Sequence, residues 1–297
     1  MAIDDTAVPK PYAGKTEGAH FQHCGTLGRQ ENCNVAVASC FVSNAKHFPV
    51  NFKPYIPIEG AAPKTFKSKI DLAKDLILDA INKQIAFSTI VFDAWYTSSE
   101  LIEFISSKTL SLIAELKINR SIRFTHPKTK QWLNLRADLI IPIIKEFYPH
   151  KLKPVNIPQN NGKTKSVLTY AFKSTLKDCS TPLNIIFVFD KWSDTDDKDV
   201  HVLITDNLAM STRSVIVTYL LRRGIEESFL AWSLTCWIKQ NACLSKILHD
   251  SPDPISQCKE SVAALIVIDS ALLLSKNPGH PLLQKIKSQR FKERIEN

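Results

Sequence analysis

A run of alternating helix and strand patterns between residues 70 and 117 constrains the fold more than any other stretch. Ile70 to Ile81 places apolar residues on one stripe at helical spacing, which predicts an amphipathic helix. Residues 87–92 (FSTIVF) predict a short buried strand, residues 98–107 a capped helix, and residues 111–117 (SLIAELK) another strand. This order of elements predicts an α/β fold with a parallel sheet.

The rest of the chain divides around this run. Residues 35–42 (VAVASCFV) are apolar on both faces, which predicts a central strand. Alternating segments between residues 122 and 206 predict a mostly antiparallel insertion, and the patterns that follow predict helices only, the first from Thr212 to about Lys239. The expected parts are a core over residues 1–121, a β-rich insertion over 122–210, a helix over 211–240 that completes the core, and a helical region with a basic tail over 241–297.

Charge and cysteine usage limit the function classes. The formal net charge of the 297 residues is +9, with a pI near 9.1, which favours a polyanionic partner such as nucleic acid. The seven cysteines form no CxxC pair, and the N-terminus has no targeting character, so we expect reduced, buried thiols in a cytoplasmic protein. The most apolar segment, residues 262–274, is too short to span a bilayer and predicts no membrane role.

Three acidic positions stand out by their settings. Asp93 closes a buried strand, and ligands of open α/β sheets gather at the carboxyl ends of strands. Asp4 and Asp5 follow a short apolar start, and on a strand they would point to opposite faces. Glu226 follows Tyr219 and Arg222 at spacings that place all three on one helical face. The plainer interpretations are an Asp93 that caps a turn and a surface salt bridge between Arg222 and Glu226.

Carboxylates in such a basic α/β chain are suited to one kind of chemistry. Carboxylate oxygens are ligands for Mg²⁺, which takes further ligands from water and from substrate phosphate. Two such ions, roughly 3.5–4 Å apart, activate a water and stabilise the leaving oxygen in phosphodiester cleavage. The sequence therefore predicts a Mg²⁺ cofactor, which Mn²⁺ can replace.

Four segments of this sequence resemble the DDE transposases of insertion sequences, in the same order as in that family: IDDTAVPK, HCGTLGRQENCNVAV, TIVFDAWYTSSELIEFI and YLLRRGIEESFLAWS. The resemblance runs from Asp4 to about Lys239. It implies an RNase H-like core interrupted by a β-rich insertion before the third acid. It also implies that Asp4, Asp93 and Glu226 are the catalytic acids and metal ligands, with Asp5 as the alternative for the first position.

The residues around the third acid match the family signature Tyr-x-x-Arg-x-x-x-Glu through Tyr219 and Arg222. Arg223 stands where a tryptophan is usual, and Ser233 where the family has a DNA-contacting lysine. DNA is the expected partner, and a homodimer is left open. The residues expected to contact DNA are Tyr219, Arg222, Arg223, Lys117 and Arg120.

The expected function is metal-dependent cleavage of transposon DNA ends and strand transfer into target DNA, in the cytoplasm and associated with the nucleoid. Members of the family carry an N-terminal helical DNA-binding region, which is absent before Asp4. The alternative is therefore a truncated, non-catalytic DNA-binding remnant of a transposase. A third interpretation is a host nuclease with the same core.

Other residues carry weaker hypotheses. His20, His23 and Cys24 resemble a ligand cluster that lacks a second pair, so we favour histidines in a loop. The acidic run over residues 190–199 is read as a solvated loop. Trp132 or Trp192 is a candidate for stacking on a flipped base.

Overall fold

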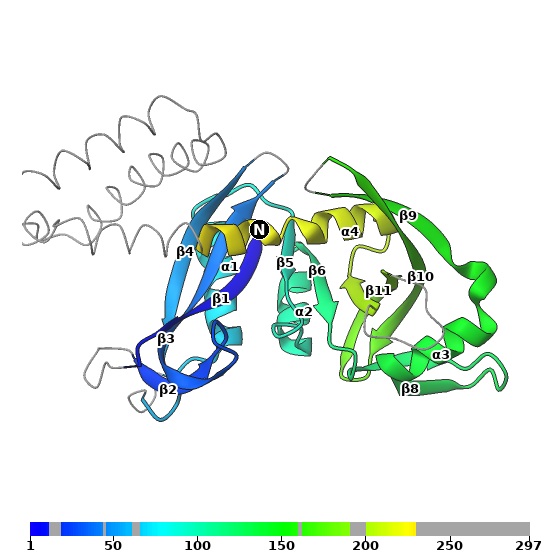
Figure 1. Cartoon of the computed structure of the whole chain (residues 1–297), viewed down its shortest axis with the longest axis horizontal. Helices are drawn as coiled ribbons and strands as arrows, with labels where there is room; N and C mark the ends of the chain where they lie inside the picture. The colour runs from blue at the N-terminus through cyan, green and yellow to red at the C-terminus, as the bar shows by residue number, and fades with distance from the viewer. Residues whose placement is uncertain (12–18, 44–45, 61–65, 160–161, 191–199, 230–297) are drawn as a thin grey trace, which may run out of the picture. The chain divides into compact units, whose positions relative to one another are not determined.

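The computed structural model describes residues 1–11, 19–43, 46–60, 66–159, 162–190 and 200–229, and these form a large β-sheet with a few helices (Figure 1). Contacts within the chain separate residues 1–228 from residues 229–297, and the features below lie in the first of these units. The strands are β1 (Ala2–Pro9), β2 (His20–Cys24), β3 (Arg29–Val42), β4 (His47–Tyr55), β5 (Thr89–Phe92), β6 (Ser111–Leu116), β7 (Ser121–Thr125), β8 (Trp132–Arg136), β9 (Lys153–Pro158), β10 (Thr164–Leu176), β11 (Cys179–Phe189) and β12 (Val200–Thr205). The helices are α1 (Lys69–Asn82), α2 (Ser99–Ser107), α3 (Ala137–Phe147), a 3₁₀ turn at Pro149–Lys151, and α4 (Thr212–Leu220).

The first half of the sheet mixes the two kinds of strand pairing. β1 pairs antiparallel with β3, which also pairs with β2 and β4, and on its other side β1 pairs parallel with β5. β5 pairs parallel with β6 along its whole length. The predicted parallel α/β run is therefore confirmed for β5, α2 and β6, and the coarse prediction of a mixed α/β fold holds.

Local sequence signals explain the two helices of this half. α1 begins at a capping box in which the Ser68 side chain accepts from the Asp71 backbone N–H and Asp71 accepts from the Ser68 backbone N–H. α2 begins at Ser98, whose side chain accepts from the backbone N–H of Leu101. Most of the apolar stripe predicted for α1 is buried, but Ile81 at its end is exposed. α2 buries Leu101, Ile102 and Ile105.

The second half of the sheet is antiparallel, as predicted, but it is not purely β. The predicted strands near residues 167–172, 185–189 and 200–205 lie within β10, β11 and β12. The sequence reading missed α3, which has Pro142 in its interior. A proline removes one helical hydrogen bond, but the helix buries Ile140, Ile141 and Ile144, and this burial outweighs the loss.

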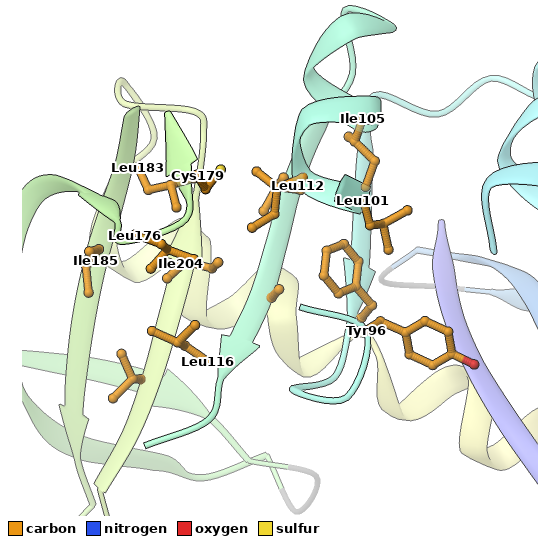
Figure 2. Close-up of a cluster of buried hydrophobic side chains, with 14 of the residues drawn as sticks. Tyr96, Leu101, Ile105, Leu112, Leu116, Leu176, Cys179, Leu183, Ile185 and Ile204 are labelled. Atoms are coloured by element: carbon orange, nitrogen blue, oxygen red, sulfur yellow. The ribbon is translucent and has the colours of Figure 1, made fainter. Parts of the chain in front are cut away.

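One hydrophobic core joins the two halves. β12 pairs with β6, so the last strand of the second half continues the sheet of the first. Figure 2 shows Leu101 and Ile105 of α2 beside Leu112 of β6, and Ile204 and Ile185 on the neighbouring strands. All five side chains are fully buried, and they belong to one cluster that also includes residues of α1 and α3.

The helix predicted from Thr212 to about Lys239 is broken in the structure. α4 ends at Leu220, a turn covers residues 221–222, and residues 223–229 are helical again. Across the break, the backbone N–H groups of Leu221, Arg222, Gly224 and Ile225 donate to carbonyl groups three residues back, as in a 3₁₀ turn. Most of the remainder of the predicted helix, and the helical region with its basic tail expected over 241–297, lie outside the described residues.

Two further predictions can be compared with this part of the chain. Cys24, Cys33, Cys40 and Cys179 are free and buried, as expected for structural thiols. No helix within the described ranges is long and apolar enough to cross a membrane.

Candidate active site

Asp4 lies where two parallel strands part. The pairing of β1 with β5 joins Ala2 to Val91 and Ile3 to Phe92, and it ends there. Asp4 and Asp93 are the next residues on the two strands. Asp4 lies within its strand, because β1 continues to Pro9 along β3, whereas Asp93 directly follows the end of β5.

The two neighbouring aspartates of β1 serve different faces of the sheet. Asp4 Oδ2 accepts a hydrogen bond from Arg222 Nη1 at 2.6 Å. Asp5 Oδ2 accepts from Lys69 Nζ at 2.8 Å, and its Oδ1 accepts from the Tyr96 hydroxyl at 3.1 Å. Because side chains alternate along a strand, only Asp4 is directed towards the segment that carries Glu226.

Arg222 joins the first and third predicted acids. Its Nη2 donates to Glu226 Oε1 at 2.7 Å, while its Nη1 binds Asp4. The side chains of Asp4 and Arg222 are 13% and 18% exposed, whereas that of Glu226 is 50% exposed. The salt bridge that the plainer interpretation proposed is therefore present, but it is one half of a bridge that reaches a buried carboxylate on β1.

Asp93 is fixed by the loop that follows it. Its Oδ1 accepts from the backbone N–H groups of Trp95 at 2.9 Å and Tyr96 at 3.3 Å, so it also caps this turn. Burial raises the pKa of Asp93, against the lowering effect of these hydrogen bonds and of Arg222. The turn-capping interpretation and a position beside Asp4 both hold for this residue.

Burial is also the largest influence on the pKa of Asp4. It raises the pKa of Asp4 to about 7, in spite of the nearby Arg222, and the negative charge of Asp93 raises it further. The two carboxylates therefore lie in one electrostatic environment, in which Asp93 acts on Asp4 and Arg222 acts on both. The structure thus brings Asp4, Asp93, Arg222 and Glu226 together from two strands and a late helix.

A fourth acid, Glu115, belongs to the same region and was missed in the sequence. Its Oε2 accepts from the Tyr219 hydroxyl at 3.1 Å, and its Oε1 lies 2.8 Å from His201 Nδ1. The hydrogen bond with His201 is the main cause of the lowered pKa of Glu115. The sequence did contain a signal for Glu115, because β6 reads SLIAEL and its only charged residue lies in a mostly buried strand. A carboxylate there needs polar partners, and the strand pairs with β5, which Asp93 follows.

The donor set suits a hard cation, but the arrangement does not. Carboxylate oxygens are the ligands that Mg²⁺ prefers. Within the described ranges, however, no three His, Cys, Asp or Glu side chains are placed to hold a metal ion. The guanidinium of Arg222 binds the oxygens of Asp4 and Glu226 instead, so the residues in this arrangement do not fit a metal.

The residues predicted to contact DNA take different positions. Tyr219 is tied to Glu115, and the Arg222 guanidinium lies 5.9 Å from the Tyr219 ring. Arg223 is exposed beside this group. Lys117 and Arg120 lie in the turn after β6, two and five residues beyond Glu115, where Lys117 is exposed and Arg120 partly so.

A hollow of about 650 Å³ lies away from these acids, at the end of β11 where Cys179 is found. Glu115 lies at the level of Ile186, further along the same strand. Trp132 is 58% exposed at the hollow, with the Arg123 guanidinium 5.1 Å from its ring. The charged side chains that line the hollow have a formal net charge of zero, because Arg123 and Lys177 are balanced by Glu103 and Asp178. The stacking role considered for Trp132 stays a prediction, and Trp192 lies outside the described residues.

The histidine cluster considered from sequence does not form. His20 and His23 lie on β2, opposite Cys33 and Gln30 of β3. Residues three apart on a strand point to opposite faces, so the two histidines cannot face one metal. Most of the acidic run over 190–199 lies outside the described residues.

Comparison with known proteins supports the resemblance drawn from the sequence. The sequence profile of the family described as DDE superfamily endonuclease matches residues 1–132. Over these residues the match agrees with the resemblance to DDE enzymes, and it supports nuclease chemistry of this class. It includes Asp4 and Asp93 and ends before Glu226.

Other comparisons add less. No curated protein sequence matches this chain. Among solved structures, the chain is similar to a piggyBac transposase in a synaptic complex with hairpin DNA, with 12% identity and a TM-score of 0.41. That similarity covers 76% of this chain and 38% of the transposase chain, so this chain spans about two fifths of that protein's length.

Proposed function

We propose that this protein is a DDE transposase that cuts the ends of a transposable element and joins them to target DNA. The observation that carries the proposal is the convergence of Asp4 and Asp93, from adjoining strands, with Glu226 through the Arg222 bridge. The profile match over the first two acids supports the same chemistry. We assign Asp4, Asp93 and Glu226 as its three acids, and Asp4 rather than Asp5 as the first.

The fold proposed for this function is an RNase H-like core with an insertion. The core consists of β1 and β3–β6 with α1, α2 and the helical segments around Arg222. The strand pairing supports this fold. β3 pairs antiparallel with β1 and β4, and β5 pairs parallel with both β1 and β6. Asp4 and Asp93 directly follow the paired residues of β1 and β5. The insertion covers about residues 122–210, so the part boundaries proposed from sequence are retained.

In the proposed reaction, water first attacks a phosphodiester bond at the element's end, and the freed 3′-hydroxyl then attacks target DNA. Mg²⁺, or Mn²⁺ in its place, remains the proposed cofactor on the strength of the resemblance and of the carboxylate ligands that it would need. In the described arrangement two of these carboxylates, Asp4 and Glu226, are bound to Arg222 instead. The contribution of the chain itself is a set of acids positioned by β1, by the end of β5 and by the helical segment over residues 223–229.

DNA is the proposed partner. The net charge of +9 favours a polyanion. Lys117 and Arg120 follow Glu115 in the chain, and Arg223 follows Arg222, so basic residues flank parts of the site. Contacts from such residues to the phosphate backbone would position the duplex without reading its sequence. A homodimer and a location at the nucleoid belong to the same proposal.

The test is cleavage of a plasmid that carries the DNA flanking this reading frame, with Mg²⁺ or Mn²⁺ present. Asp93→Asn should abolish cleavage while keeping the fold, because the Asn side-chain oxygen still accepts from the backbone N–H groups of Trp95 and Tyr96. Glu146→Gln is the matched control, an exposed acid of α3 that should cut like the wild type. Full activity of Asp93→Asn would overturn the assignment.

A second candidate is a DNA-binding protein without catalysis. The observation that favours it is that Arg222 neutralises two of the three acids. This candidate predicts DNA binding with no metal-dependent cleavage in any variant. Cuts without preference for the flanking sequence would instead indicate a nuclease of the same class that is not a transposase.

A further inference from the structure

The guanidinium of Arg222 occupies the position between carboxylates in which a cation is needed. It presents one nitrogen to Asp4 and another to Glu226, at 2.6 and 2.7 Å. Its positive charge also lowers the pKa of Asp93 and of Glu115, opposing the effect of burial on both. One arginine thus balances the carboxylates that the metal would otherwise hold.

The backbone around Arg222 is anchored on both sides and irregular in between. On one side, Tyr219 of α4 donates to Glu115 of β6. On the other, the Ser228 hydroxyl lies 3.3 Å from Cys40 Sγ of β3. Arg222 itself lies in the turn between the two helical segments. Neither anchoring contact involves the Arg222 side chain.

We propose that Arg222 is an internal counter-ion that closes the carboxylate site to divalent metal until a DNA phosphate takes the guanidinium. A guanidinium binds phosphate through the same paired N–H donors that it offers to carboxylates. When the phosphate binds, Asp4 and Glu226 lose their cation and become available to a metal. This inference rests on the proposed function, since it assigns the same carboxylates to the metal.

The consequence is an ordered assembly in which DNA precedes metal. Metal affinity is low in the free protein because the ion must compete with an arginine already in place. It rises when DNA is bound, because the substrate has removed the competitor. Cleavage is thereby confined to the protein–DNA complex.

The test is calorimetric titration of the purified chain with MnCl₂, without DNA. Arg222→Gln should bind Mn²⁺ roughly tenfold more tightly than the wild type, because one positive charge beside the acids is gone. Arg222→Lys should fall between the two, since a single ammonium is a compact point charge without the guanidinium's fork. Arg213→Gln is the matched control, an exposed arginine of α4 that binds the Asn156 carbonyl and should leave the affinity unchanged.

A second titration uses an arbitrary duplex oligonucleotide at low salt, corrected for the metal that the DNA alone binds. DNA should raise the Mn²⁺ affinity of the wild type roughly tenfold and that of Arg222→Gln much less. Circular dichroism of each variant verifies the fold, and Arg222→Lys retains a charge should Arg222→Gln unfold. Adding Asp93→Asn should remove the Mn²⁺ binding in every background.

Equal or weaker Mn²⁺ binding by folded Arg222→Gln would overturn the counter-ion role while leaving the proposed function in place. The same holds if Arg222→Lys binds Mn²⁺ no more tightly than the wild type. Metal binding that Asp93→Asn does not affect, or no binding in any variant with or without DNA, would overturn both proposals.

Discussion

Asp4 and Asp5 are neighbours in β1, yet their carboxylates serve opposite faces of the sheet, Asp4 binding Arg222 and Asp5 binding Lys69. Asp4→Asn should therefore abolish cleavage of the flanking-DNA plasmid. Asp5→Asn should keep most of the activity but lower the free energy of unfolding by about 1–3 kcal/mol, because a charged hydrogen bond to a largely buried lysine is weakened. Urea denaturation and the cleavage assay together measure both effects, and the reverse pattern would assign Asp5 as the first acid.

The stability of the protein should depend on pH through Asp4. Burial raises its pKa from 3.8 in the unfolded chain to about 7 in the folded chain. The folded state then binds more protons than the unfolded state between about pH 4 and pH 7, so the free energy of unfolding falls as pH rises through this window. Asp4→Asn should be more stable than the wild type at pH 8, by roughly 4 kcal/mol at most. Urea melts of both proteins at pH 4.5 and 8 measure the difference, and a constant difference would contradict the prediction.

The contact between Glu115 and Tyr219 should hold α4 on the sheet. Tyr219→Phe removes the hydroxyl that donates to Glu115 and should cost about 1–2 kcal/mol of folding free energy. Glu115→Gln should also destabilise, and the double variant should be less unstable than the sum of the two losses. A double-mutant cycle by urea denaturation measures this coupling, and strictly additive losses would show that the contact contributes little.

Lys117 and Arg120 should contribute electrostatically to DNA binding. Each phosphate contact that is lost lowers the dependence of affinity on salt, so Lys117→Ala and Arg120→Ala should each reduce the slope of log K against log salt by about 1. Binding should weaken equally for unrelated duplex sequences. Fluorescence anisotropy at several salt concentrations tests this. Lys83→Ala serves as the control, because Lys83 is an exposed lysine at the C-terminal end of α1 and the capping contacts there are made by the backbone.

Gly224 should be required where the second helical segment meets β3 and β4. A Cβ at this position would lie 3.0 Å from Val42 Cγ1 and 3.1 Å from His47 Cβ. Gly224→Ala should therefore destabilise by about 1–3 kcal/mol, although alanine is the better helix former. Gly25→Ala, where nothing lies within 4 Å of the added atom, is the control for thermal denaturation.

Much of the local structure follows from the sequence. α1 and α2 form where apolar spacing and a capping serine coincide, and β5 and β6 form where short apolar runs are bounded by polar residues. The helix α3 was not predictable from such signals, because Pro142 argues against it and burial against the sheet decides for it. The break after Leu220 was not predictable either, since the helical periodicity continues through it.

The sequence by itself singled out Asp4, Asp93, Arg222 and Glu226, because strand ends and helical spacing are local properties of the chain. It could not choose between Asp4 and Asp5, since that choice depends on which face of β1 meets the later helix. It could not find the Glu115 network, because Glu115 is 86 residues from His201 and 104 residues from Tyr219 in the chain. Only the tertiary structure placed Arg222 between two of the acids, because a contact across 218 residues depends on how the sheet and the helices pack.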